Sequence, residues 1–279
     1  MKWQRAKRSG NVEDRRGRGM GGFGGGRGVG GLGLGGLAIV VVVSLVMGKN
    51  PLEILSLLAG GDPTMTQSSA PAPVDDETSQ FVAAILGSTE AVWSSIFGQQ
   101  GQRYPAPRLV LFSGHVASAC GSASAAVGPF YCPADNQVYL DTSFFQAMRA
   151  QLGGGGDFAE AYVIAHEVGH HIQTLTGVAQ QVNDLRLRGG SIEGDDGPLV
   201  RQELQADCYA GVWAGKNRNA IEPGDFEEGM QAASSIGDDK LTGGRVSSEN
   251  FTHGTSAQRV SWFKRGLQSG RMEDCDTFK

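Results

Sequence analysis

The most informative stretch of this sequence is AYVIAHEVGHHIQTL, residues 161–175. It predicts a helix that presents His166 and His170 one turn apart, because residues four apart lie on the same face of a helix. Two imidazoles at this spacing can bind one metal ion, and Zn²⁺ suits them. Glu167 follows the first histidine directly, so its carboxylate would lie beside the ion as a general base for an attacking water.

The flanking residues favour a helix over this stretch. Apolar side chains precede and follow the histidines at helical spacing, and Thr176 and Gly177 form a typical stop signal. A glycine-rich run, residues 153–156, precedes Asp157, which we expect to be the N-cap. Short patterns of this kind also arise by chance, as a surface pair of histidines, so further ligands must be found elsewhere in the chain.

A second predicted helix offers such ligands, with the sequence PLVRQELQADCYAGVWA over residues 198–214. Glu203 and Asp207 lie one turn apart on a common face. A catalytic zinc takes three protein ligands and leaves its fourth position to water, so Glu203 is the candidate third ligand. Asp207 is placed to accept a hydrogen bond from the outer nitrogen of a ligand histidine. A solvated acidic face is the alternative, but unpaired charge would be costly in a helix this apolar.

Four segments together resemble a known family. HEVGHHIQ (166–173) followed by RQELQADCYAGVWA (201–214) is similar to the gluzincin arrangement. With CGSASAAVGPFYCPADNQVYLD (120–141) and FTHGTSAQRVSWFKRG (251–266), these segments resemble the family of bacterial single-span membrane proteins described as Putative neutral zinc metallopeptidase. The resemblance covers most of residues 75–279.

The resemblance implies a zinc metallopeptidase with His166 and His170 as metal ligands. It also implies that Glu203 is the third ligand and Glu167 the catalytic residue. His253 lies in the last of the similar segments, so we treat it as a further candidate catalytic residue and as the first alternative to Glu203.

The N-terminal region predicts a membrane anchor. Residues 1–27 hold eight Lys or Arg residues against two acidic ones, a local net charge of +6 in a chain whose net charge is −5. Residues 28–48 carry no charge and end in a strongly apolar run, which predicts one transmembrane helix. A buried strand and a cleaved signal peptide are alternatives, but no clear cleavage site follows. A basic arm also suits nucleic-acid binding, yet the apolar run behind it favours a membrane protein without that activity.

The order of charge and apolar residues also predicts topology. A basic arm ahead of the span places the N-terminus in the cytoplasm and residues from 50 onward outside it, in the periplasm or at the cell exterior. Residues 61–77 are rich in Pro, Ser, Ala and Asp, which predicts a flexible linker, and we assign residues 49–77 to it. The predicted domain is therefore 78–279.

Four cysteines, all in this domain, agree with an oxidising compartment. They allow three disulfide connectivities. Cys120 with Cys132 is the most economical pair, and it leaves Cys208 to join Cys275. A second metal site is the weaker alternative, because no pair has CxxC spacing.

The remaining pattern predicts helices and a few short strands. The expected strands lie within 108–116, 129–132 and 136–141, and the expected helices lie at 76–97, after Asp141, at 178–188, at 220–236 and after Thr255 or Ser256. His115 follows the first strand and could line the cleft. His171 is rotated away from the ligand face, so we expect it to be structural or to support the ligands.

We therefore predict a membrane-anchored α+β protein with a mainly helical, zincin-like domain. Its predicted function is that of a zinc-dependent endopeptidase acting on proteins or peptides. The alternative is a non-catalytic envelope scaffold stabilised by zinc. Such a scaffold needs the ligands but not Glu167, so the presence of Glu167 favours the enzyme.

Overall fold

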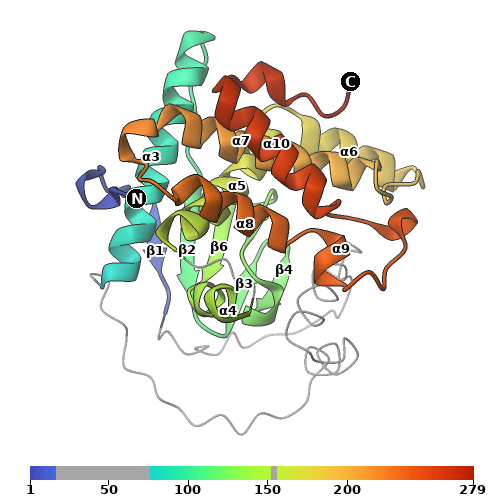
Figure 1. Ribbon diagram of the computed structural model, residues 1–279, viewed down its shortest axis with the longest axis horizontal. Coiled ribbons are helices and arrows are strands. Elements are labelled where there is room, and N and C mark those ends of the chain that lie inside the picture. Colours follow the sequence, from blue (N-terminus) through green and yellow to red (C-terminus); the bar gives the residue numbers. More distant parts are fainter. Residues whose placement is uncertain (17–75, 152–155) are drawn as a thin grey trace, which may run out of the picture.

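The computed structural model of the protein describes residues 1–16, 76–151 and 156–279. The predicted transmembrane helix, residues 28–48, lies outside these ranges, as does nearly all of the predicted linker 49–77. The described part is a mixed α+β structure that is mainly helical, as predicted. In Figure 1 the small sheet lies in the lower half, and helices α5, α7, α8 and α10 cross above it.

The main sheet has four short strands. In their order across the sheet they are β1 (Val12–Asp14), β2 (Arg108–Phe112), β6 (Gln137–Asp141) and β5 (Phe130–Cys132). β1, β2 and β6 run parallel, and the edge strand β5 runs antiparallel to β6. Successive residues of β2 point to opposite faces. Leu109 and Leu111 join the main core, whereas Val110 and Phe112 join a second apolar cluster.

A separate two-stranded hairpin consists of β3 (His115–Ser118) and β4 (Gly121–Ser124). The sequence predicted one continuous strand over 108–116, but the chain breaks it into β2 and β3. Gly114, at the break, has a φ of 77°, a conformation that glycine adopts without strain. Its amide donates a hydrogen bond to Oδ2 of Asp141 at 2.7 Å. The chain therefore leaves the main sheet here.

Helices make up most of the described chain. Their bounds are α3 (Glu77–Gln99), α4 (Ser143–Gln151), α5 (Asp157–Leu175), α6 (Val178–Leu187), α7 (Pro198–Lys216), α8 (Asp225–Ser235), α9 (Asp238–Leu241) and α10 (Ser256–Ser269). Each helix predicted within the domain has its counterpart among these. Thr255 is the N-cap of α10 and forms a capping box with Gln258. The expected N-cap of α5 is wrong, because Gly156 takes that position and Asp157 is the first helical residue.

The central helix α5 packs against α7 and α8, and α7 packs against α10. Glycines allow the close approaches. A Cβ at Gly169 of α5 would lie 3.0 Å from Cα of Ala206 of α7, so no larger residue fits without moving the helices. Gly211 and Gly266 have the same role where the backbones of α7 and α10 meet. The helices that carry the site residues are thus held at short distance.

Among the described residues, one helix is long and apolar enough to cross a membrane, and it is α3. In the structure this helix is part of the domain core. Its side chains Val82, Leu86 and Trp93 are fully buried, and the ring of Trp93 packs edge-on against Tyr209 of α7. Core packing therefore accounts for its apolar composition.

Residues 1–16 pack against the domain. Trp3 begins the short 3-10 helix η1 (Trp3–Arg5), is 6% exposed, and packs edge-on against Phe81 of α3 with ring centroids 5.4 Å apart. β1 extends the sheet by pairing with β2. These residues therefore belong to the folded domain and are not the separate arm that the charge pattern predicted. One buried ring and a three-residue strand leave no periodic signal in a basic segment.

Both predicted disulfides are present, and they pair all four cysteines. Cys120 in the turn between β3 and β4 is joined to Cys132 at the end of β5. Cys208 of α7 is joined to Cys275, which ends the short 3-10 helix η5 (Met272–Cys275) near the C-terminus.

Candidate metal centre

Helix α5 presents the two histidines of the motif on one face. His166 is 5% exposed, and its ring centroid lies 4.7 Å from that of His170. The surrounding residues of α5 are almost all buried in the core. The rings therefore have a rigid support, as metal ligands require.

Helix α7 brings Glu203 to these histidines. Its Oε2 atom lies 3.2 Å from Nε2 of His166, and its Oε1 atom lies 3.4 Å from Nε2 of His170. One ligand atom from each of the three residues lies within 4.8 Å of the others. The structure thus brings together the three residues that the sequence proposed as ligands.

The outer nitrogens of both histidines are occupied. Nδ1 of His166 lies 2.9 Å from Oδ1 of Asp207, the contact expected for that residue, and Nδ1 of His170 lies 2.9 Å from Oε1 of Gln173. If each Nδ1 donates to its oxygen, each Nε2 of the neutral rings keeps a lone pair. Both lone pairs then face the Glu203 carboxylate, and a positive charge between them, either a ring proton or a metal ion, satisfies these facing acceptors. A set of two histidines and one glutamate suits Zn²⁺.

A buried arginine completes this network, and the sequence analysis missed it. Arg259 of α10 is 1% exposed, and it forms two contacts of 2.9 Å with Asp207, from Nε to Oδ2 and from Nη2 to Oδ1. Its Nη1 also lies 3.5 Å from Oε2 of Glu203. The hydroxyl of Tyr162 donates to Oδ1 of Asp207 as well. The sequence did contain one indication that Arg259 is buried, because helical spacing places it on the same face of α10 as the apolar Phe263.

The network determines the charges of the site. Burial alone would raise the pKa of Asp207, but the Arg259 guanidinium outweighs it and holds that pKa below its usual range. Burial likewise would lower the pKa of His166, yet hydrogen bonds with Asp207 and Glu203 raise it to about 9. The carboxylates around His166 therefore favour a positive charge at this point, which a ring proton or a metal ion would supply.

Glu167 lines the same cavity as the three candidate ligands. It is 8% exposed, and burial raises the pKa of its carboxyl group. A raised pKa moves a carboxylate toward the range in which it can accept and release a proton during catalysis.

His253 also lines the cavity, in the loop that leads into α10. Its Nδ1 lies 3.2 Å from Oδ1 of Asp238. The other carboxylate oxygen, Oδ2, accepts hydrogen bonds from the backbone amides of Thr252, His253 and Gly254 at 2.8, 2.7 and 3.1 Å. A single buried carboxylate thus fixes both the loop and the imidazole.

The other two histidines lie outside this arrangement. His115 is exposed at the start of β3 and does not line the cavity, so the suggestion that it could do so is wrong. His171 is buried, and its ring nitrogens contact the hydroxyl of Tyr131 at 3.0 Å and the carbonyl oxygen of Pro105 at 2.7 Å. It therefore has a structural role, one of the two that were expected for it.

The cavity beside the candidate ligands has a volume of about 490 Å³. Its polar lining includes the residues of α5, α7 and α10 described above. Its apolar lining includes Ala125, Val127, Phe130, Tyr131, Phe144 and Met148. The cavity therefore offers an apolar surface next to a charged centre.

Comparison with known proteins agrees with this chemistry. The model of the family described as Putative neutral zinc metallopeptidase matches residues 1–278. The chain belongs to this family. It is 45% identical over 285 residues to the uncharacterized protein YpfJ of Escherichia coli, and the alignment covers 100% of this chain and 99% of the relative. It is 42% identical over 249 residues to the uncharacterized protein Rv2575 of Mycobacterium tuberculosis, covering 84% of this chain and 81% of the relative. No solved structure gives a significant match.

The family match begins at residue 1 and so includes the docked N-terminal segment. It supports a zinc metallopeptidase in general terms. The relatives named here are uncharacterized, so they add no substrate.

Proposed function

We propose that the protein is a zinc-dependent endopeptidase that hydrolyses peptide bonds in proteins or peptides. The observation that carries this proposal is the cluster of His166, His170 and Glu203 beside Glu167 in one cavity. A bound zinc ion would be held by the first three residues and would supply Lewis-acid polarisation of the scissile carbonyl and a more acidic water.

Glu167 is the proposed general base. Its carboxylate takes a proton from the attacking water and passes it to the leaving amine, so that one residue acts in both halves of the reaction. Burial, which raises its pKa, supports the second transfer because a less acidic carboxyl group holds the proton until the amine needs it.

His253 is proposed to stabilise the negative charge that develops on the substrate carbonyl oxygen. It lines the cavity, and Asp238 holds its ring. Burial would raise the pKa of Asp238, but hydrogen bonds from His253 and from backbone amides outweigh it and lower that pKa. Asp238 therefore stays ionised and fixes the orientation of the imidazole.

The substrate is proposed to bind beside β5. This strand is an edge of the described sheet, and its residues Phe130 and Tyr131 line the cavity. An edge strand offers free backbone groups that can pair with an extended peptide. The apolar residues around it would accept an apolar side chain of that peptide.

The test of the proposed reaction is Glu167→Gln. The substitution is nearly isosteric, but an amide cannot take a proton from water, so cleavage of a generic unfolded protein should fall roughly 10²–10⁴-fold while zinc content stays unchanged. Glu160→Gln is the matched control, because Glu160 is also buried in α5 but pairs with Arg149. Equal rates for the wild type and Glu167→Gln would remove Glu167 from the mechanism. Zinc binding without any cleavage by the wild type would favour a scaffold.

We further propose that the domain and the docked residues 1–16 lie on the same side of the membrane, outside the cytoplasm. A single crossing by residues 28–48 would place them on opposite sides and is incompatible with this arrangement. The two disulfides support an oxidising compartment. The pairing of β1 with β2 supports the shared side, because residues 1–16 cannot join the sheet from across a membrane. The pairing is therefore incompatible with the predicted combination of a cytoplasmic N-terminus and an extracytoplasmic domain.

Topology can be tested with two exposed reporter positions, Gln4→Cys and Lys264→Cys. A membrane-impermeant maleimide should label both in intact cells whose outer barrier is permeable to the reagent. Labelling of Lys264→Cys alone would separate the N-terminus from the domain. Labelling of neither before lysis would place both in the cytoplasm.

A further inference from the structure

The two candidate ligand histidines are held by different kinds of partner. His166 contacts a carboxylate, whereas Nδ1 of His170 lies 2.9 Å from the amide oxygen of Gln173. Gln173 is fully buried and lies one turn beyond His170 on α5. A neutral amide carries no charge that attracts the imidazole. Its ability to orient the His170 ring therefore depends on how firmly the amide itself is held.

Gln173 is held by a chain of hydrogen bonds that leads away from the cavity. Its Nε2 donates to the carbonyl oxygen of Gln202 at 2.6 Å and to Oε1 of Gln205 at 3.1 Å. Nε2 of Gln205 then donates to the carbonyl oxygen of Cys275 at 3.1 Å. The two backbone carbonyls can only accept, so both amides have one orientation in which every contact joins a donor to an acceptor. In that orientation the amide oxygen of Gln173 faces His170.

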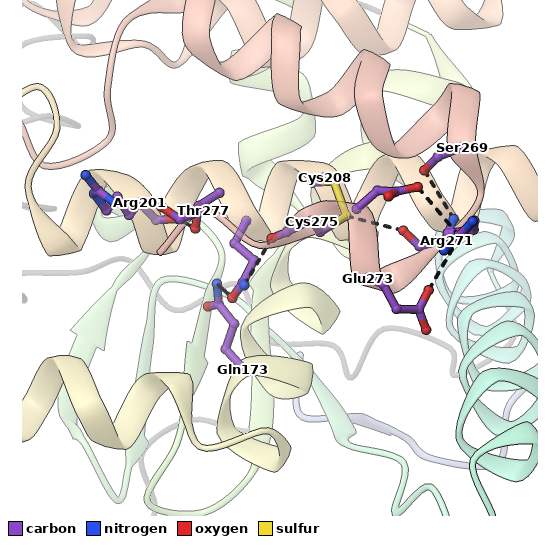
Figure 2. The surroundings of a disulfide bond; sticks show 10 residues. Gln173, Arg201, Cys208, Ser269, Arg271, Glu273, Cys275 and Thr277 are labelled. Carbon is purple, nitrogen blue, oxygen red and sulfur yellow. Dashed lines mark hydrogen bonds and ion pairs between the residues drawn. A yellow bond between two sulfur atoms is a disulfide. The ribbon is translucent and has the colours of Figure 1, made fainter. Parts of the chain in front are cut away.

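The far end of this chain lies in the C-terminal tail, which a disulfide holds against α7. Figure 2 shows Cys275 joined to Cys208, with the tail running along α7 toward Thr277 and Arg201. The hydroxyl of Thr277 donates to the carbonyl oxygen of Arg201 at 2.7 Å, and Nη1 of Arg201 donates to the carbonyl oxygen of Thr277 at 3.0 Å. The disulfide is therefore the covalent anchor of the acceptor on which Gln205 depends.

We propose that Gln173 and Gln205 are positioning residues for His170, and that the Cys208–Cys275 disulfide raises zinc affinity by holding the tail against Gln205. This inference rests on the zinc site of the proposed function, although it does not require catalysis. Without the disulfide, the last residues of the chain would be held by packing and hydrogen bonds only, and chain ends without a covalent anchor tend to fray. Gln205 would then lose its acceptor, and Gln173 would lose part of its support.

The experiment measures zinc affinity of the purified protein by competition with a chelator. Gln173→Met keeps the length of the side chain but removes both polar atoms, so zinc should bind roughly 10–100-fold more weakly. Gln205→Met and the double variant Cys208→Ser/Cys275→Ser act one and two contacts further from His170 than Gln173 does. Each should therefore lower zinc affinity by about tenfold or less. The matched control is Cys120→Ser/Cys132→Ser, which removes the other disulfide and should leave zinc affinity unchanged.

A double-mutant cycle separates positioning from general loss of structure. Gln205→Met should weaken zinc binding in the presence of the Cys208–Cys275 disulfide and should add nothing in its absence, because both changes break one chain of contacts. Additive losses would overturn the coupling. Gln205→Met keeps both disulfides, so it tests the inference even if the cysteine variant fails to fold. If this variant bound zinc with wild-type affinity, the inference would be overturned while the proposed function would stand. A wild type that binds no zinc would overturn both the inference and the proposed function.

Discussion

The metal centre and the docked N-terminal segment both bury charged groups, but they do so differently. In the metal centre, Arg259 and Asp207 are enclosed by helices and have exposed fractions of 1% and 0%. At the N-terminus, the α-amino group of Met1 has two acidic partners. The side chain of Glu222 is 44% exposed, and that of Asp225 is 7% exposed. The Arg259–Asp207 pair is almost fully shielded from solvent, whereas the second network includes a partly exposed partner that water can replace.

This difference predicts different consequences of mutation. Removal of one charge from an enclosed network leaves its partner buried and unpaired, which is strongly destabilising. Removal of a charge at a partly exposed pair costs little, because water solvates the remaining group. We therefore expect changes in the metal centre to affect zinc binding and stability together, and changes in the N-terminal segment to affect stability alone.

The largest expected effect is that of Glu203→Ala on zinc binding. The substitution removes one of three ligands, so zinc affinity should fall by more than the roughly 10–100-fold that loss of an outer partner costs. Asp207→Ala, which removes such an outer partner, should fall within that range. Zinc content and affinity of the purified variants would rank the two. Full zinc retention by Glu203→Ala would place the third ligand elsewhere, with His253 the first residue to test.

Arg259→Met should destabilise the folded protein by about 3–5 kcal/mol, because it leaves Asp207 buried without its cation. Chemical unfolding of the zinc-free protein measures this loss without a contribution from metal binding. The double variant Arg259→Met/Asp207→Asn should recover part of the stability, since no unpaired charge remains. Lys264→Met is the matched control on the exposed face of α10. Strictly additive losses in the double variant would mean that the two residues do not act as a pair.

The sequence was sufficient where the chemistry depends on spacing within one helix. His166 and His170 are four residues apart on α5, and Glu203 and Asp207 are four apart on α7, so each pair was visible as a pattern. The need for a third ligand then connected the two helices. Both disulfide pairings followed from economy of loop length.

The sequence was insufficient where partners come from distant segments. The contact from Gln205 to Cys275 spans 70 residues, and that from Arg259 to Asp207 spans 52, so no local pattern marks them. The error at Asp157 has the same origin. Its carboxylate accepts a hydrogen bond from Nε1 of Trp3 at 3.0 Å, a contact across 154 residues that the N-cap rule does not anticipate.

Trp3→Ala is the strongest test of the N-terminal segment. The indole is buried against Phe81 and donates to Asp157, so its removal should cost about 3 kcal/mol of stability. Zinc affinity should not change, because none of these contacts reaches the ligands. Trp3→Phe keeps the packing and loses the hydrogen bond, so it should cost less. A fall in zinc affinity equal to that of Asp207→Ala would show that the two regions are coupled.

The smallest expected effect is that of neutralising the α-amino group of Met1. The amine lies 3.3 Å from Oδ1 of Asp225 and 3.4 Å from Oε2 of Glu222. After acetylation Asp225 is not stranded, because its Oδ2 still accepts the backbone amide of Glu222 at 2.7 Å and its charge lies at the N-terminal end of α8. Acetylation should therefore cost about 1 kcal/mol or less, and Glu222→Gln less still, since Glu222 is partly exposed. Denaturant unfolding at low and high salt measures both, and salt should reduce the difference from the unmodified protein. A loss as large as that of Trp3→Ala, unaffected by salt, would mean that the amine is enclosed in the way that Arg259 is.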